Sequence, residues 1–315
     1  MTKMTPLIRI GTRGSKLALI QANETRDRLA AAHDELREDG AIALEIITTT
    51  GDRVRDRPLA EIGGKGLFEK EIEDALQERR IDIAVHSLKD CETVAAEGTV
   101  IECVLEREDP RDAFLSPVAG NIEQLPEGAV IGTASVRRQA LLLHRRPDLK
   151  CVLFRGNVDT RLAKLAAGEV DATLLAFAGL KRMGLADQAT RVLELDEMPT
   201  AVAQGAIGVQ CRLADDGPDA RIRDWLAAIN HEESRLRVTA ERSMLATLDG
   251  SCRTPIAGLA TLDGDGRVTL VGHVAALDGS ALHRAEAAGT ADEAVEIGAR
   301  VGQDLIQKAG PDFRV

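Results

Sequence analysis

Three kinds of residue in this sequence could do chemistry: one carboxylate, one thiol and a group of arginines. Asp90 ends the apolar segment "IDIAVHSLKD", after Ser87 and Lys89. If this segment is a strand of an open α/β sheet, Asp90 lies at its carboxyl end, where such sheets bind their ligands. A carboxylate there suits acid–base work. The alternative, a helix cap or a partner for a lysine, is equally open on position alone.

The thiol is Cys252, in the segment "GSCRTPIAG". A predicted helix ends at Asp249 and Gly250, so Cys252 falls in an exposed loop beside Arg253. A thiol that cycles during turnover is usually activated by a helix N-terminus or a histidine. Here the dipole of a helix C-terminus opposes the thiolate, although Arg253 offsets it. The pattern favours a thiol that reacts once and stays modified; the alternative is an incidental loop cysteine.

The arginines lie at predicted strand ends or helix starts, where backbone N–H groups also favour anions. A single such arginine is more often a solvated surface residue, but six at equivalent positions indicate an anion site, since guanidinium groups bind carboxylates in bidentate fashion. A charge-assisted hydrogen bond contributes roughly 1.5 to 3 kcal/mol. Several could therefore hold a polyanion against the net charge of -11. The six are Arg13, Arg137, Arg138, Arg155, Arg161 and Arg182.

Composition excludes several classes of protein. The 315 residues exceed one usual hydrophobic core, and with only 2% aromatic residues the cores must be aliphatic. The acidic net charge and the few aromatic rings argue against a nucleic-acid partner. No stretch approaches the ~20 apolar residues of a membrane span, and no signal peptide is evident, so we expect a cytoplasmic protein. The five cysteines include no CxxC pair and the six histidines are scattered, which predicts no disulfide framework and no metal site.

Strand and helix patterns alternate along most of the chain. "LIRIGT" reads as a strand before a helix that Ser15 could cap, and the pattern recurs through "LEIITTT", "AVIGTA" and "CVLF". This predicts mainly parallel α/β sheets. Beyond about residue 230 a long helix, Asp-Gly turns typical of hairpins and a last helix from about Asp292 to Lys308 predict a small α+β domain. The charged, glycine-bearing loop within 48–71 is either a lid or a surface excursion.

Several segments, in order from residue 8 to about 258, resemble the porphobilinogen deaminase family. They include "IRIGTRGSKLALIQA", "GGKGLFEKEIEDAL", "DIAVHSLKD", "EREDPRDAF", "GTASVRRQ", "RGNVDTRLAKL" and "GSCRTPIAG". The resemblance implies two α/β lobes built like solute-binding proteins, with the ligand cleft between them, and a small α+β C-terminal domain that presents the cysteine. We place the first lobe at 1–105 and 206–228, the second at 106–205 and the C-terminal domain at 229–315.

The resemblance implies an enzyme that joins four porphobilinogen molecules head to tail, releases ammonia at each step and frees hydroxymethylbilane by adding water. A dipyrromethane cofactor, held by a thioether to Cys252, primes the chain, and Asp90 matches the catalytic aspartate. The same matching indicates two sets of binding residues. Those for the cofactor are Lys89, Thr133, Ser135, Arg137 and Arg138, and those for the substrate are Arg13, Ser15, Arg155, Asn157, Arg161 and Arg182. It also implies a monomer that passes its product to uroporphyrinogen-III synthase.

Two other functions share part of this pattern. A non-catalytic bilobal anion-binding or sensor module needs the lobes and arginines but neither Asp90 nor Cys252, and a cysteine-dependent acyl hydrolase needs a histidine near Cys252. The chain also departs from the family pattern after Asp90, where "CET" replaces the usual Val-Pro-Thr and makes Cys91 a second thiol near the site. Since Asp90 and Cys252 are both retained, we expect an active enzyme.

Overall fold

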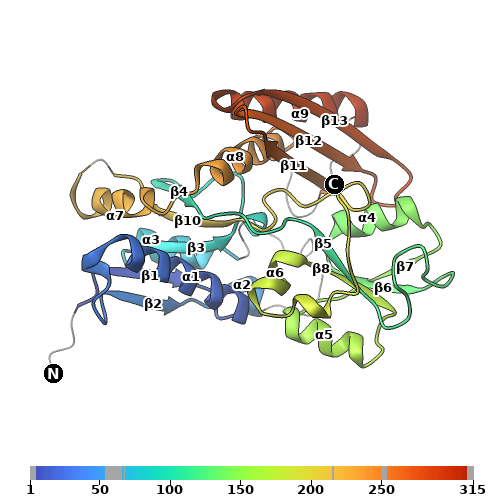
Figure 1. Cartoon of the computed structure of the whole chain (residues 1–315), viewed down its shortest axis with the longest axis horizontal. Coiled ribbons are helices and arrows are strands. Elements are labelled where there is room, and N and C mark those ends of the chain that lie inside the picture. The colour runs from blue at the N-terminus through green and yellow to red at the C-terminus, as the bar shows by residue number, and fades with distance from the viewer. Residues whose placement is uncertain (1–4, 54–65, 67, 215, 250–253, 311–315) are drawn as a thin grey trace. The chain divides into compact units, whose positions relative to one another are not determined.

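The computed structural model describes residues 5–53, 66, 68–214, 216–249 and 254–310 (Figure 1). Cys252 and most of the predicted lid lie outside these residues. The chain groups into two compact units, which we describe separately. Of the described residues, unit 1 holds those within 5–53, 66–107 and 206–235, and unit 2 holds those within 108–205 and 236–310. Among the described helices none is long and apolar enough to cross a membrane.

Unit 1 is built on a five-stranded sheet in the order β2-β1-β3-β10-β4. β1 is parallel to β2 and β3, whereas β10 is antiparallel to both of its neighbours. The strands are β1 (Ile8–Thr12), β2 (Ile42–Ile46), β3 (Ile83–Ser87), β4 (Thr99–Val104) and β10 (Ile207–Arg212). The helices are α1 (Lys16–Ala32), α2 (Thr50–Arg53), α3 (Lys70–Gln77) and α7 (Gly217–Ala227), with 3-10 turns at Asp34–Leu36 and Leu88–Asp90.

Strand β3 is the centre of this sheet and packs on both faces. Ile83 and Val85 join one core with Leu29 of α1, while Ala84 joins a second core with Ile72 of α3. A strand buried on both faces reads as a continuous apolar run, which is how "IDIAVHSL" was predicted to be a strand. Rigid packing on both sides fixes the point at which the chain leaves β3 toward Asp90.

Unit 2 contains a second sheet of the same design, in the order β7-β6-β8-β5-β9. β6 is parallel to β7 and β8, and β5 is antiparallel to β8 and β9. Its strands are β5 (Asp112–Leu115), β6 (Val130–Thr133), β7 (Lys150–Leu153), β8 (Ala172–Ala176) and β9 (Arg191–Val192). Its helices are α4 (Val136–Arg145), α5 (Val158–Ala166) and α6 (Phe177–Arg182), with a 3-10 turn at Ala186–Gln188.

The predicted fold of two α/β lobes is confirmed, but each sheet holds one strand that runs against the parallel trend. β5 and β10 are the first strands after the chain passes from one unit to the other. Neither follows a helical crossover from its neighbouring strand, and such a crossover is what requires parallel pairing. The local strand–helix alternation therefore predicts the parallel strands, but it does not predict the antiparallel direction of β5 and β10.

The C-terminal part of unit 2 is the predicted small α+β domain. β11 (Ile256–Leu262), β12 (Arg267–Ala275) and β13 (Leu282–Thr290) form an antiparallel meander, flanked by α8 (Glu232–Thr247) and α9 (Ala294–Ala309). The last helix follows a 3-10 turn at Ala291–Glu293, so it starts slightly later than predicted. A Cβ at Gly298 of α9 would lie 2.3 Å from the Ala240 carbonyl oxygen of α8, so only glycine permits this close approach.

His273 of β12 makes the stability of the protein depend on pH. Burial, helped by the charge of Arg284, lowers the pKa of His273 to about 4. An unfolded histidine titrates near 6.5. As pH falls from about 6.5 toward 4, the unfolded chain takes up a proton that the folded chain does not, so the folded state loses stability over this range.

We expect this group to lower the free energy of unfolding by about 2 kcal/mol between pH 7 and pH 5. Urea unfolding followed by circular dichroism at the two pH values measures it. His273→Gln should remove that part of the pH dependence, and His283→Gln, on the neighbouring strand β13, serves as the matched control. An identical pH dependence in wild type and His273→Gln would contradict the assignment.

Candidate active site

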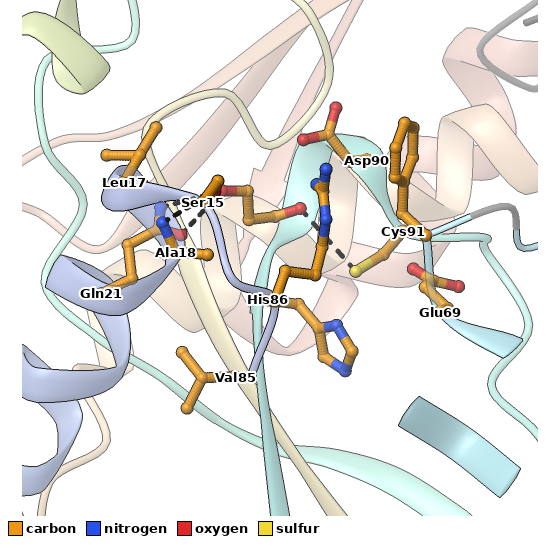
Figure 2. A pocket seen from close by; sticks show the side chains of 12 residues that line it. Ser15, Leu17, Ala18, Gln21, Glu69, Val85, His86, Asp90 and Cys91 are labelled. Carbon is orange, nitrogen blue, oxygen red and sulfur yellow. Dashed lines mark hydrogen bonds between the residues drawn. The ribbon is translucent and has the colours of Figure 1, made fainter. Parts of the chain in front are cut away.

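A pocket in unit 1 forms where the loops after β1 and β3 meet. The two strands pair in parallel with Ile10 opposite Ile83, so the chain leaves both at the same edge of the sheet. Ser15 caps α1 there by accepting a hydrogen bond from the Ala18 amide at 3.3 Å, as predicted. Twelve residues line the pocket (Figure 2): Arg13, Ser15, Leu17, Ala18, Gln21, Phe68, Glu69, Val85, His86, Ser87, Asp90 and Cys91.

Asp90 contributes a carboxylate to this pocket from the 3-10 turn that follows β3. Its side chain is half-buried, and within the described part of the chain it makes no hydrogen bond or ion pair. The expected alternatives, a helix cap and a lysine partner, are therefore absent among these residues. Lys89 lies in the same turn but does not line the pocket.

Glu69 is a second acid in the pocket, and its environment is different. It is only 6% exposed, and its two carboxylate oxygens each lie 3.2 Å from the backbone nitrogen of Glu92, which donates to them. Burial raises the pKa of Glu69 to about 7, although a hydrogen bond from the Cys91 thiol works in the opposite direction. The pocket thus holds one acid that has no partner in the described part of the chain, Asp90, and one whose pKa lies near neutral pH, Glu69.

Arg13 is held in place by an acid and an aromatic ring. Its Nη2 and Nε donate to Asp52 at 2.5 and 3.1 Å, and its guanidinium carbon lies 4.1 Å from the centre of the Phe68 ring. Burial alone would raise the pKa of Asp52, but the hydrogen bonds and charge of Arg13 outweigh it and the pKa is lowered. Asp52 is therefore ionised, and it orients Arg13 while leaving Nη1 without a partner among the described residues.

A second cluster of charges lies in unit 2, where Arg137 and Arg138 share one carboxylate. Both arginines are about 5% exposed or less and Asp112 is fully buried. Asp112 accepts from Arg137 at 2.8 Å, from Arg138 at 2.7 Å and from Gln204 at 2.8 Å. Burial opposes ionisation of Asp112, but the charges of the two arginines outweigh it and hold its pKa well below the usual range.

The cluster carries two positive charges and one negative charge, so an excess positive charge is buried. An uncompensated buried charge is costly, and it is relieved by an anion. In addition, the Nε atom of Arg137 is buried and makes no hydrogen bond to any described residue. The first turn of α4 therefore offers both a charge and a hydrogen-bond donor to an anionic ligand.

The remaining predicted residues of unit 2 follow the parallel strands of the second sheet. Thr133 ends β6, and Ser135 caps α4 by accepting from the Arg138 amide. Asn157 caps α5 after β7, and Arg161 on that helix donates to the Phe154 carbonyl at 2.8 Å. Arg182 ends α6 after β8, and Arg155 lies just after β7. All eight predicted residues of unit 2 thus lie at, or after, the carboxyl ends of the parallel strands β6, β7 and β8.

The fold and the site define an α/β protein of two sheet-containing lobes and a small α+β domain, with an aspartate that has no partner among the described residues in one lobe and a buried arginine pair in the other. Residues 8–219 match the family described as "Porphobilinogen deaminase, dipyromethane cofactor binding domain", and residues 235–307 match its C-terminal domain. The chain belongs to the porphobilinogen deaminase family.

Two relatives of known family agree with this assignment. A porphobilinogen deaminase of Paracoccus denitrificans is 58% identical over 97% of this chain and 96% of its own. A chloroplastic porphobilinogen deaminase of Oryza sativa is 55% identical over 98% of this chain and 85% of its own. Among solved structures, the methionine-binding protein MetQ matches with a TM-score of 0.43 at 13% identity, over 72% of this chain and 91% of its own.

The predicted family and enzyme class are therefore confirmed: a transferase of tetrapyrrole biosynthesis that condenses porphobilinogen and carries a dipyrromethane cofactor. The non-catalytic binding module is not favoured. The charge of the described residues suits this cofactor, because its pyrrole rings carry carboxylate side chains. Arg137 offers a buried donor with no partner among the described residues, and its cluster carries excess positive charge.

Sequence reasoning missed several residues that shape these sites. Asp112 binds the arginine pair and Gln204 donates a hydrogen bond to Asp112; they lie 25 and 67 residues from Arg137 and have no spacing that links them to it. The one signal was the segment "EREDPRDAF", in which Asp112 stands directly after an arginine. Glu69 and His86 in the pocket of unit 1 were also missed, because they read as a helix start and a strand interior.

The arginine pair makes Asp112 important for stability. Asp112→Asn would remove the one carboxylate that the two buried guanidinium groups share, and we expect a loss of about 3 to 5 kcal/mol in the free energy of unfolding. Asp109→Asn is the matched control, because Asp109 pairs with the partly exposed Arg111 and its loss should cost about 1 kcal/mol or less. Urea unfolding followed by circular dichroism compares the two. Equal effects in both variants would contradict a special role for the buried cluster.

Proposed function

We propose that Asp90 is the catalytic aspartate of the porphobilinogen condensation. Loss of ammonia from porphobilinogen leaves a positively charged methylene-pyrrolenine, which the free α-carbon of a pyrrole attacks before that carbon loses a proton. An ionised carboxylate can accept hydrogen bonds from pyrrole N–H groups, stabilise the positive charge and assist the proton transfer. The dipyrromethane cofactor, when bound, supplies the free α-carbon from which the chain grows.

The observation that carries this proposal is the Asp90 carboxylate in its pocket, without a charged partner among the described residues. A carboxylate already paired with a cation would have its charge compensated and would stabilise a substrate cation poorly. Glu69 shares the pocket but is more deeply buried, and its raised pKa leaves it partly protonated near pH 7. Asp90 is thus the better source of negative charge.

We assign the binding residues by the charge of their ligands. Arg137 and Arg138, with Thr133, Ser135 and Lys89, would hold the carboxylates of the cofactor, which is attached through Cys252. The substrate carboxylates would be bound by Arg13, Ser15, Arg155, Asn157, Arg161 and Arg182. Support comes from the helix caps at Ser15, Ser135 and Asn157, because the backbone N–H groups at such helix starts favour anions.

We also propose three domains, with a first lobe at 1–105 and 206–228, a second lobe at 106–205 and a C-terminal domain at 229–315. The protein would work as a monomer in the cytoplasm. The four described cysteines are free thiols, as expected in a reducing compartment. Hydroxymethylbilane is an open chain, so a ring-closing enzyme, uroporphyrinogen-III synthase, would consume it. Light scattering during size-exclusion chromatography would test the monomer.

Asp90→Asn tests the catalytic role. The neutral amide keeps the shape of the side chain but loses the charge, so we expect hydroxymethylbilane formation to fall about 10²- to 10⁴-fold with the fold intact. Single-turnover measurement of ammonia release and product formation checks this. Asp27→Asn, an exposed acid on α1, is the matched control and should remain at the wild-type rate. A near-wild-type rate for Asp90→Asn would remove Asp90 from the mechanism.

Intact-protein mass tests the cofactor attachment. The purified wild type should weigh more than its sequence by two linked pyrrole units, and Cys252→Ser should lack this increment because the thioether cannot form. Cys91→Ser is the matched control and should keep the increment. An unmodified wild type, or an increment that disappears with Cys91, would contradict attachment at Cys252.

A further inference from the structure

Three potential metal ligands converge in the pocket of unit 1, next to Asp90. Glu69 precedes α3, His86 lies in β3 and Cys91 follows the 3-10 turn after β3. Their ligand atoms, a carboxylate oxygen, a ring nitrogen and the sulfur, all lie within 4.8 Å of one another, and these groups are buried, although Cys91 as a whole is partly exposed. Figure 2 shows the Glu69 and Cys91 side chains beside the His86 ring.

The hydrogen bonds around His86 determine which ring nitrogen can bind a cation. Thr99 donates its hydroxyl proton to the Ala96 carbonyl, so its oxygen must accept the bond from the Gln210 amide at 2.8 Å. The same Gln210 amide nitrogen donates to the Glu73 carboxylate at 2.9 Å. The oxygen of Gln210 is therefore the atom that lies 3.0 Å from His86 Nε2, and it can only accept.

It follows that in the neutral ring of His86 the proton is on Nε2 and the lone pair is on Nδ1. Histidines that bind metals nearly always donate their other ring N–H to an acceptor, which fixes the tautomer and the ring orientation. Gln210 serves His86 in this way, and Glu73 and Thr99 in turn hold Gln210. The histidine is thus oriented as a ligand before any ion arrives.

The charges of the three groups also suit a divalent cation. An ionised Glu69 and a thiolate at Cys91 would place two negative charges in a largely buried site, which is costly unless a cation neutralises them. One sulfur, one imidazole nitrogen and one carboxylate oxygen form a donor set typical of Zn²⁺. Tetrahedral Zn²⁺ would bring these atoms to roughly 3.5 Å from one another, so about one ångström of side-chain movement closes the site.

We propose that Glu69, His86 and Cys91 form a binding site for Zn²⁺ or a similar divalent cation of intermediate softness. The three residues line the same pocket as Asp90 and Arg13, so a bound ion would place a double positive charge beside the proposed catalytic carboxylate. It would compensate the charge that Asp90 offers to the substrate cation. Zn²⁺ binding at this site therefore inhibits the enzyme reversibly, and this consequence rests on the proposed role of Asp90.

Co²⁺ titration of the metal-free holoprotein tests the site itself, because a thiolate ligand to Co²⁺ produces a charge-transfer absorption band. We expect one equivalent of Co²⁺ to produce this band and Zn²⁺ to abolish it by displacement. Cys91→Ser should lose the band, and Glu69→Gln should weaken Co²⁺ binding by at least the 10- to 100-fold that loss of an outer partner costs. Cys151→Ser, which removes a partly buried thiol of unit 2, is the matched control and should bind like wild type.

The Co²⁺ titration of the wild type can overturn the proposal by itself, so the test does not depend on how well the variants fold. Absence of the charge-transfer band, or a band that Cys151→Ser abolishes, would refute the site. Thermal unfolding with and without Zn²⁺ adds a second measurement, in which wild type should gain stability and Cys91→Ser should not. Variants that show the Co²⁺ band should also be inhibited by Zn²⁺, and a chelator should reverse this inhibition. A band without inhibition would support the metal site but count against the role of Asp90.

Discussion

The parallel pairing of β1 with β3 is the constraint on which the pocket depends. Both strands are apolar and buried, and a register slip of one residue would turn Ile8, Ile10 and Ile83 out of the core. With the register fixed, the loop that carries Arg13 and the turn that carries Asp90 leave the sheet at the same edge. The geometry of this pocket thus depends on hydrophobic packing several residues away from Arg13 and Asp90.

The two units treat their charged groups in opposite ways. In unit 2 a buried carboxylate, Asp112, holds Arg137 and Arg138 at fixed positions and leaves one positive charge in excess. In unit 1 the Asp90 carboxylate lies in the pocket without a charged partner among the described residues. Charges fixed before the ligand binds need no reorganisation during the reaction, which is the basis of electrostatic catalysis. An acidic chain can bind an acidic ligand because the positive charge is concentrated locally.

Strand β10 links the fold to the chemistry of the pocket in a further way. It pairs antiparallel with β3, with Gly208 opposite His86 and Gln210 opposite Ala84. A Cβ at Gly208 would lie 2.2 Å from the Leu88 side chain, so glycine lets the start of the turn that bears Asp90 pack against the sheet. Gln210 from the same strand orients His86. A segment more than 100 residues away in sequence thus shapes the surroundings of Asp90.

The sequence by itself determined the elements and the types of chemistry, because those signals are local. Apolar runs predicted β1 and β3, Ser15 predicted the start of α1, and Asp90 lay at the end of a predicted strand. Only the tertiary structure decided which distant groups meet: Asp112 with the arginine pair, Gln210 with His86, and Glu69 with Cys91. These contacts depend on the order of the strands and on the antiparallel direction of β5 and β10. Both follow from the path of the chain from one unit to the other, and neither leaves a periodic pattern in the sequence.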